Sequence, residues 1–248
     1  MVTETAFFRR VNPAYKFLIF FIITLLTIFL RDATLLAALS GCALLVYLIF
    51  SPLTLKWKVG LLLPFVLLAF FSGITVILFG LGDDVLFQFL WWRISSESLA
   101  HGTMIILRTL FFSLIGLSFA TTTNPVLFFY SAMQQFKVPT FIAYSFLTVF
   151  RLIPIMAEEI TILNKAMRVR GVSRIKGPRG VWEKMKRYSI TMLSQSIRRA
   201  FRISVAMSAK KFTTGPRTFY YTTTFSRVDV YYTLLWLAII GGCLFFFN

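Results

Sequence analysis

Two short basic segments carry the side chains best suited to binding another molecule. They read AMRVRG at 166–171 and AMSAKKF at 206–212, and each places a cation four positions after its alanine, Arg170 in the first and Lys210 in the second. An arginine guanidinium can hold a carboxylate through two parallel hydrogen bonds, whereas a lysine ammonium is a compact point charge. The chemistry available at these segments is therefore recognition of an acidic surface.

Residues for catalysis are scarce. The chain has one histidine, His101, so no Ser/His/Asp set can be completed, and no His/Cys/Glu spacing suits a metal. Cys42 and Cys243 lie far apart in apolar runs and are expected to be buried small hydrophobes. A GxxxxGK[ST] phosphate loop is absent. We therefore expect a protein that is not an enzyme, with no catalytic residue, no metal and no cofactor.

The composition is typical of an integral membrane protein. Of 248 residues, 58% are hydrophobic and 14% charged, against roughly 25% charged in soluble domains. The net charge of +17 is concentrated between Lys137 and Arg217, where 17 basic residues face three acidic ones. Such a block is expected on the cytoplasmic side, in contact with anionic membrane lipid. Aromatic residues interleave with the cations, but they lie on apolar helices, so no nucleic-acid partner is expected.

Five apolar stretches are close to the ~20 residues that cross a bilayer as a helix. They lie at about 16–30, 33–50, 59–80, 102–120 and 228–247. Basic residues before the first stretch and between the second and third place those ends in the cytoplasm. The sequence predicts an all-α, multi-pass protein of the cell membrane with about five transmembrane helices, a cytoplasmic N-terminus and a cytoplasmic basic domain.

The chain divides into three parts on this basis. Residues 1–120 contain the first four transmembrane helices, and residues 227–248 contain the last. Residues 121–226 form a cytoplasmic or interfacial domain of about three long, amphipathic helices. The second of these, which begins near Phe141, is apolar as far as Met156, is interrupted by Pro154, and becomes polar from Glu158. It is expected to begin in the membrane and emerge into water.

The third helix of this domain has two distinct faces. A polar stripe follows steps of three or four residues: Lys184, Arg187, Thr191, Gln195, Arg198 and Arg202. Small residues lie roughly opposite, at Ser189, Ser196, Ala200 and Ser204. Two interpretations stay open: another helix crosses at close range over the small residues, or the helix lies on the lipid surface.

The ends of the two basic helices are expected to differ. Gly171 directly follows Arg170 and can adopt the left-handed conformation that closes a helix. Lys211 occupies the equivalent position in the second segment, where a side chain has a steric cost. The second helix is therefore expected to continue for about another turn, to Gly215-Pro216.

Arg108 is the exceptional charge inside a predicted span. A membrane arginine is normally functional or paired with another group. It also lies only about two turns into its helix, from where it could extend toward the outer surface. Both interpretations remain open from the sequence.

Four segments, in order, resemble the transmembrane T components of energy-coupling factor (ECF) transporters. They are FFRRVNPAYKFL at 7–18, TTTNPVLFFYSAMQQFKVP at 121–139, FRLIPIMAEEI at 150–160, and the pair of basic segments. The resemblance spans nearly the whole chain and is most specific between 121 and 212.

This resemblance implies a coupling subunit. A T component joins two ATP-binding cassette ATPase subunits to an S component that captures a vitamin or a transition-metal ion. The ends of two coupling helices dock in grooves of the ATPases. By the resemblance, Ala166, Arg168, Arg170 and Gly171 form the first docking motif, with Arg170 as its central arginine. Ala206, Ala209, Lys210 and Lys211 fill the second.

The second motif departs from the family pattern, because Lys210 and Lys211 stand where Arg and Gly are expected. The departure implies two unlike ATPases or one fused double ATPase with differing grooves, or a first motif that alone is critical. The S component is expected to contact the apolar faces at 141–153 and in the first helix of the basic domain. A different class of function also fits the residues: a membrane-anchored scaffold whose basic helices bind anionic lipid or a soluble partner.

Overall fold

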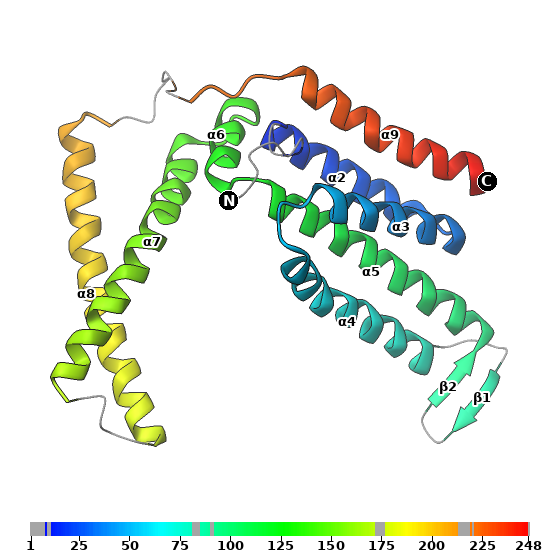
Figure 1. The fold of residues 1–248 in the computed structure, drawn as a ribbon, viewed down its shortest axis with the longest axis horizontal. Coiled ribbons are helices and arrows are strands. Elements are labelled where there is room, and N and C mark those ends of the chain that lie inside the picture. Colours follow the sequence, from blue (N-terminus) through cyan, green and yellow to red (C-terminus); the bar gives the residue numbers. More distant parts are fainter. Residues whose placement is uncertain are drawn as a thin grey trace. The chain divides into compact units, whose positions relative to one another are not determined.

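The computed structural model describes residue 8 and residues 11–80, 85–89, 92–171, 177–212, 219 and 221–247. Its chain forms two compact units, Met1–Ser131 with Thr222–Asn248, and Ala132–Tyr221. The first unit contains α2 (Pro13–Phe29), α3 (Ala33–Phe50), α4 (Leu55–Phe79), α5 (Ser96–Thr122) and α9 (Arg227–Phe247). The second contains α7 (Thr140–Val169) and α8 (Pro178–Ala209). The boundary between them falls within α6 (Pro125–Gln135) (Figure 1).

The expected all-α membrane fold is confirmed. Five described helices are long and apolar enough to cross a membrane: Ala33–Phe50, Leu55–Phe79, Ser96–Thr122, Thr140–Val169 and Arg227–Phe246. Four of them match predicted spans. The predicted span at 16–30 is α2, which is apolar but has 17 residues, about 26 Å at 1.5 Å per residue. The remaining helix is α7, which continues through Pro154 as one 30-residue helix.

A short hairpin precedes α5 and was not expected. Strands β1 (Val85–Phe89) and β2 (Trp92–Ser95) pair antiparallel, with Val85 opposite Ser95 and Phe89 opposite Trp92. The Ser95 side chain then accepts a 3.0 Å hydrogen bond from the Ser98 amide and caps α5. This cap starts the helix six residues before the predicted span.

The core of the first unit lies between α2, α3, α5 and α9. Its largest fully buried apolar side chains include Tyr47, Phe111, Leu36 and Leu114. These residues come from helices with apolar side chains on every face, as expected where neighbouring helices cover one face and lipid the other. The outward faces accordingly expose large apolar groups, such as Phe29 at 80%.

Two glycines allow α4 to approach α5 closely. A Cβ atom added at Gly73 would lie 2.9 Å from the carbonyl oxygen of Gly102, and one added at Gly102 would lie 3.0 Å from that of Gly73. Both are tighter than ordinary contacts, so the two backbones meet where neither residue has a side chain. Such small-residue contacts are a common way for membrane helices to pack.

A buried polar cluster joins the beginning of α2 to the ends of two other helices. The Lys16 ammonium donates to the carbonyl oxygen of Phe8 and to the hydroxyl of Thr122, the last residue of α5. The Asp229 carboxylate, on α9, accepts from the amides of Asn12 and Ser226, both at 2.7 Å. Asn12, Lys16 and Asp229 are all at most 5% exposed. Buried polar groups need such partners, so this cluster fixes three segments together.

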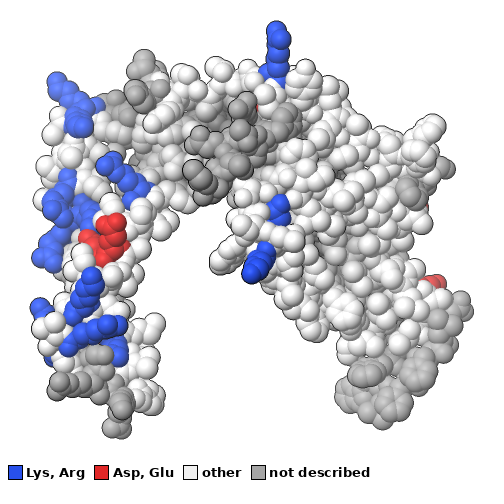
Figure 2. All heavy atoms as spheres, viewed as in Figure 1, with Lys and Arg blue, Asp and Glu red and all other residues white. Residues whose placement is uncertain are grey.

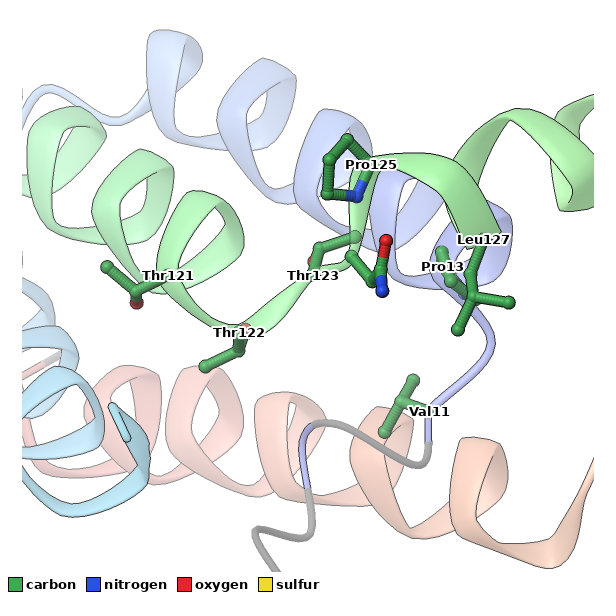
Figure 3. A pocket seen from close by; sticks show the side chains of 8 residues that line it. Val11, Pro13, Thr121, Thr122, Thr123, Pro125 and Leu127 are labelled. Carbon is green, nitrogen blue, oxygen red and sulfur yellow. The ribbon is translucent and has the colours of Figure 1, made fainter. Parts of the chain in front are cut away.

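A pocket of about 590 Å³ adjoins this cluster. Figure 3 shows the residues that line it, Val11 and Pro13 at the start of α2 and the segment from Thr121 to Leu127, with Pro13 beside Leu127. Asn124 caps α6 here by accepting a 2.9 Å hydrogen bond from the Val126 amide. The two Asn-Pro pairs of the sequence thus each begin a helix, since Asn12 accepts from Ala14 at the start of α2 in the same way.

Arg108 pairs with a helix end. Its Nη2 atom donates a 2.8 Å hydrogen bond to the carbonyl oxygen of Leu30, the residue that caps the C-terminus of α2. Carbonyl groups at a helix C-terminus lack partners within the helix and favour a nearby cation. The structure therefore supports a pairing role for this membrane arginine.

Candidate functional site: the basic ends of α7 and α8

The end of α7 forms a glycine-closed cap. Arg170 is the capping residue, and its amide donates to the Ala166 carbonyl at 3.1 Å. Gly171 follows with a φ of +73° and donates to the Arg168 carbonyl at 3.1 Å. This is the left-handed closure that the sequence predicted. Arg168, Val169 and Arg170 are exposed, with Val169 at 89%.

The end of α8 forms the same cap with a lysine in the glycine position. Lys210 caps the helix and donates to the Ala206 carbonyl at 3.1 Å. Lys211 has a φ of +50° and donates to the Ser208 carbonyl at 3.0 Å, and Phe212 donates to the Met207 carbonyl at 2.9 Å. These last two bonds form the paired closure of a Schellman motif, in which glycine is the usual left-handed residue.

The expectation that α8 continues for another turn is therefore wrong. The helix ends at Ala209, and the predicted stop at Gly215-Pro216 lies outside the described residues. The prediction considered only the steric cost of a left-handed conformation at Lys211. Two backbone hydrogen bonds and the packing of Phe212 offset that cost. The ring centroid of Phe212 lies 5.7 Å from that of Tyr144 on α7, in an edge-to-face contact.

The two ends are structurally equivalent positions 40 residues apart. Arg170 corresponds to Lys210, and Gly171 to Lys211. All four residues predicted for the second motif, Ala206, Ala209, Lys210 and Lys211, are exposed. In the first motif Arg168 and Arg170 are exposed, and Ala166 and Gly171 are half-buried. Each end thus presents two cations to solvent, beside backbone carbonyl groups that favour cations there.

Polar contacts hold α7 and α8 together where they cross (Figure 1). Glu159 and Arg199 form an ion pair in which both side chains are about four-fifths buried. The Tyr188 hydroxyl donates a 2.9 Å hydrogen bond to Asn164 Oδ1. Neither contact was predicted. The signal for the ion pair was present, because Glu158 and Glu159 are the only carboxylates on α7 and lie where its apolar stretch ends.

Two grooves flank this crossing. One, of about 710 Å³, is lined by Ser196, Ala200 and Ser204 of α8 and by residues of α7 that include Tyr144 and Met156. Ser189, Ala200 and Ser204 are exposed, so within the described part of the chain no helix covers the small-residue face of α8 at close range, and that interpretation stays a prediction.

The other groove, of about 1050 Å³, contains most of the predicted polar stripe. Thr191, Gln195, Arg198 and Arg202 line it from α8. Arg187 lies outside it and instead pairs with Glu183 on its own helix at 2.9 Å. Figure 2 shows the resulting concentration of Lys and Arg over the second unit. The unit can therefore bind anionic groups at two helix ends and along this groove. Among the described residues, no group of His, Cys, Asp and Glu could hold a metal ion.

Comparisons with known proteins identify relatives over most of the chain. The family model CbiQ, described as cobalt transport protein, matches residues 4–221. A protein of Exiguobacterium sibiricum named energy-coupling factor transporter transmembrane protein EcfT is 28% identical over 66% of this chain and 66% of its own. Proteins of the same name from Bacillus subtilis and Brevibacillus brevis are 24% and 26% identical, each over 86% of this chain and 83% of their own.

Proposed function

Because the chain belongs to the CbiQ family and is a transmembrane T component of an ECF transporter, we propose that it couples ATP hydrolysis by partner subunits to solute uptake. In this proposal two ATP-binding cassette ATPases, or one fused double ATPase, dock on the ends of α7 and α8. An S component binds the solute, a vitamin or a transition-metal ion. The chain itself is the non-catalytic connection, with the second unit in the cytoplasm.

The observation that carries the proposal is the pair of matching, exposed cationic caps. Arg170 and Lys210 occupy the same position in the same cap on two different helices. A groove lined by carboxylates would bind such an end through charge and through contacts with the cap. Arg170 can add a bidentate bond, which Lys210 cannot. The first end is therefore the stronger docking site in this proposal, and the second depends more on long-range charge.

Motion of the docked ends would be transmitted through the crossing of α7 and α8. The Glu159–Arg199 ion pair and the Tyr188–Asn164 hydrogen bond join the two helices away from their ends. A change in the separation of the ATPases would then turn one helix against the other, a rigid-body displacement of packed elements. The exposed apolar face of α7 at 141–153, which includes Phe141 at 67% and Ile153 at 55%, is the proposed contact for the S component.

Two substitutions test the docking model. Arg170→Ala should lower solute uptake by at least tenfold, either by releasing the ATPases or by separating hydrolysis from uptake, since it removes a bidentate charged contact. Lys210→Ala should lower uptake less, by about threefold, because a point charge is more easily replaced by its neighbour Lys211. Uptake into cells and ATPase co-purification would be measured for both.

Wild-type uptake in both variants would contradict docking at these ends. A second experiment tests the alternative function, a membrane-anchored scaffold. If gentle solubilisation in several detergents yields the chain without any ATP-binding subunit, the coupling role is wrong and a lipid-bound or partner-bound scaffold is the better account.

A further inference from the structure

Two lysines hold a backbone conformation that favours glycine. In the described part of the chain, the non-glycine residues with a positive φ are Lys137, at +51°, and Lys211, at +50°. Lys211 closes α8, and Lys137 follows the end of α6. The Val138 amide closes the turn at Lys137 by donating a 3.4 Å hydrogen bond to the Ala132 carbonyl. Residues held in such disfavoured conformations cluster at binding and switch sites, so the pair points to a binding surface.

Both lysines lie toward the same end of the second unit. Phe212, the residue after Lys211, contacts Tyr144 on α7, with ring centroids 5.7 Å apart. Tyr144 follows Lys137 by three residues of link and four of helix. At 1.5 Å per helical residue and at most ~3.5 Å per extended residue, the Cα atoms of Lys137 and Tyr144 are no more than about 17 Å apart. A partner surface of about 800 Å² is roughly 30 Å across, so one partner can reach both lysines.

The segment that follows α8 also contacts the end of α6. The Nε2 atom of Gln134, on the last turn of α6, donates a hydrogen bond to the carbonyl oxygen of Tyr221. The end of α6, the start of α7 and the end of α8 are thus connected by side-chain contacts. We call this part of the unit the lysine end, defined by Lys137, Lys210 and Lys211.

The lysine end carries positive charge that no nearby carboxylate balances. Its three lysines are all exposed. The carboxylates between residues 132 and 221 are Glu158, Glu159 and Glu183. Glu158 lies about 21 Å along α7 from Tyr144, and Glu183 lies about 40 Å along α8 from Lys210. Glu159 is paired with Arg199. The lysine end therefore attracts an acidic partner.

The chemistry of the three cations indicates what kind of acidic partner fits. A lysine ammonium is a point charge and lacks the planar fork by which arginine holds one carboxylate. Three separate ammonium groups are therefore best matched by several carboxylates spread over a surface. Phe136, next to Lys137, is 41% exposed and offers an apolar contact beside the charge. A protein surface supplies both features together.

We propose that the ATPase at the end of α8 binds the whole lysine end, so that Lys137 is a third docking residue beside Lys210 and Lys211. The proposal rests on the coupling function above and defines the surface that its second docking site uses. It also gives a reason for the missing arginine in the second motif. Charge spread over two segments of the chain takes the place of one bidentate contact.

Site-specific photocrosslinking in the intact, detergent-purified complex tests this surface. Benzoylphenylalanine in place of Phe136 should form an adduct with an ATP-binding subunit, which mass spectrometry would identify. The same group in place of Val169, 89% exposed at the end of α7, reports docking at the first end. Phe70, 52% exposed on the membrane helix α4, is the matched aromatic control and should give no ATPase adduct.

The pattern of adducts separates this inference from the docking model. ATPase adducts from Val169 but not from Phe136 would refute the extended surface and leave docking at the helix ends intact. Adducts from neither position would refute docking itself. Adducts from Phe136 with lipid alone, or with the S component alone, would mean that Lys137 faces a different partner and would overturn the proposal.

A charge variant tests the role of the lysine itself. Lys137→Gln should lower the amount of ATPase retained on the purified chain about threefold at low salt, as expected for the loss of one exposed ion pair. The loss should shrink as salt increases, and Lys137→Arg should retain binding. Lys186→Gln is the matched control, because Lys186 is exposed on α8 about 35 Å from the end of that helix. Equal losses in Lys137→Gln and Lys186→Gln would indicate diffuse attraction to a basic unit and contradict a defined surface.

Discussion

Lys211 shows how a single residue can hold a conformation that its side chain disfavours. Its φ of +50° places it in the left-handed region, where glycine has no steric cost and other residues do. The hydrogen bonds from the Lys211 amide to the Ser208 carbonyl and from the Phe212 amide to the Met207 carbonyl keep the cap closed. The charge of this side chain is what the proposed docking of an ATPase at the end of α8 would use.

Substituting this residue separates the two effects. Lys211→Gly should stabilise the cap by about 1 kcal/mol, because it removes the left-handed penalty while both backbone bonds remain. The same change should weaken ATPase binding, because it removes one of two cations at the end of α8. Thermal unfolding in detergent measures the first effect, and ATPase co-purification against increasing salt measures the second.

Gly171→Lys provides the reciprocal control, since it adds the penalty and the charge at the end of α7. It should destabilise that cap by a similar amount. If Lys211→Gly instead lowers the melting temperature, the αL cap described for α8 is wrong.

At the scale of elements, the contact between α4 and α5 depends on the absence of two side chains. Gly102→Ala should lower the free energy of unfolding by about 1–3 kcal/mol, because the new methyl group would overlap Ile77 and approach the Gly73 carbonyl. The melting temperature of the purified protein would show the loss.

Gly116→Ala is the control on the same helix. A Cβ atom there would meet nothing within 4 Å. The substitution should therefore change the free energy of unfolding only through the better helix propensity of alanine. A similar melting temperature for the two variants would mean that α4 and α5 are not in close contact at these glycines.

Helices were predicted more accurately than their ends and contacts. Apolar length alone located α3, α4, α5 and α9, since a bilayer demands about 20 apolar residues whatever they pack against. The α5 start was missed because the Ser95 cap is a local hydrogen bond that hydropathy does not register. Pro154 was expected to interrupt its helix, yet α7 continues through it, because other contacts can compensate for one missing backbone bond.

The candidate site was predictable in composition and less so in geometry. The repeated Ala-Met spacing correctly aligned Arg170 with Lys210 and Gly171 with Lys211. The general preference for glycine at a left-handed cap position predicted that α8 would continue past Lys211, and this prediction was wrong. The Glu159–Arg199 pair joins residues 40 positions apart. The carboxylates at the end of the apolar stretch indicated that Glu158 or Glu159 would have a partner, but no local pattern identified Arg199.

For the whole molecule, Asp229 joins segments from opposite ends of the sequence. It accepts from the amide of Asn12, 217 residues away, and from that of Ser226. Asp229→Ala should destabilise the protein by about 2 kcal/mol, because the buried amide of Asn12 and the part-buried amide of Ser226 lose their acceptor. Asp229→Asn retains one oxygen acceptor and should cost less. Thermal unfolding of both variants tests the ranking, and equal melting temperatures would show that the carboxylate is not essential to the cluster.

The crossing of α7 and α8 has one more consequence, which concerns mechanics. Glu159 lies ten residues before the last residue of α7, and Arg199 lies ten residues before the last residue of α8. At 1.5 Å per residue, each helix end is therefore about 15 Å from the shared ion pair. Two levers of equal length about one pivot deliver equal displacements at their tips. In the proposed docking model, a rotation of α7 against α8 about this ion pair would therefore move the two helix ends by equal distances, although their side chains differ.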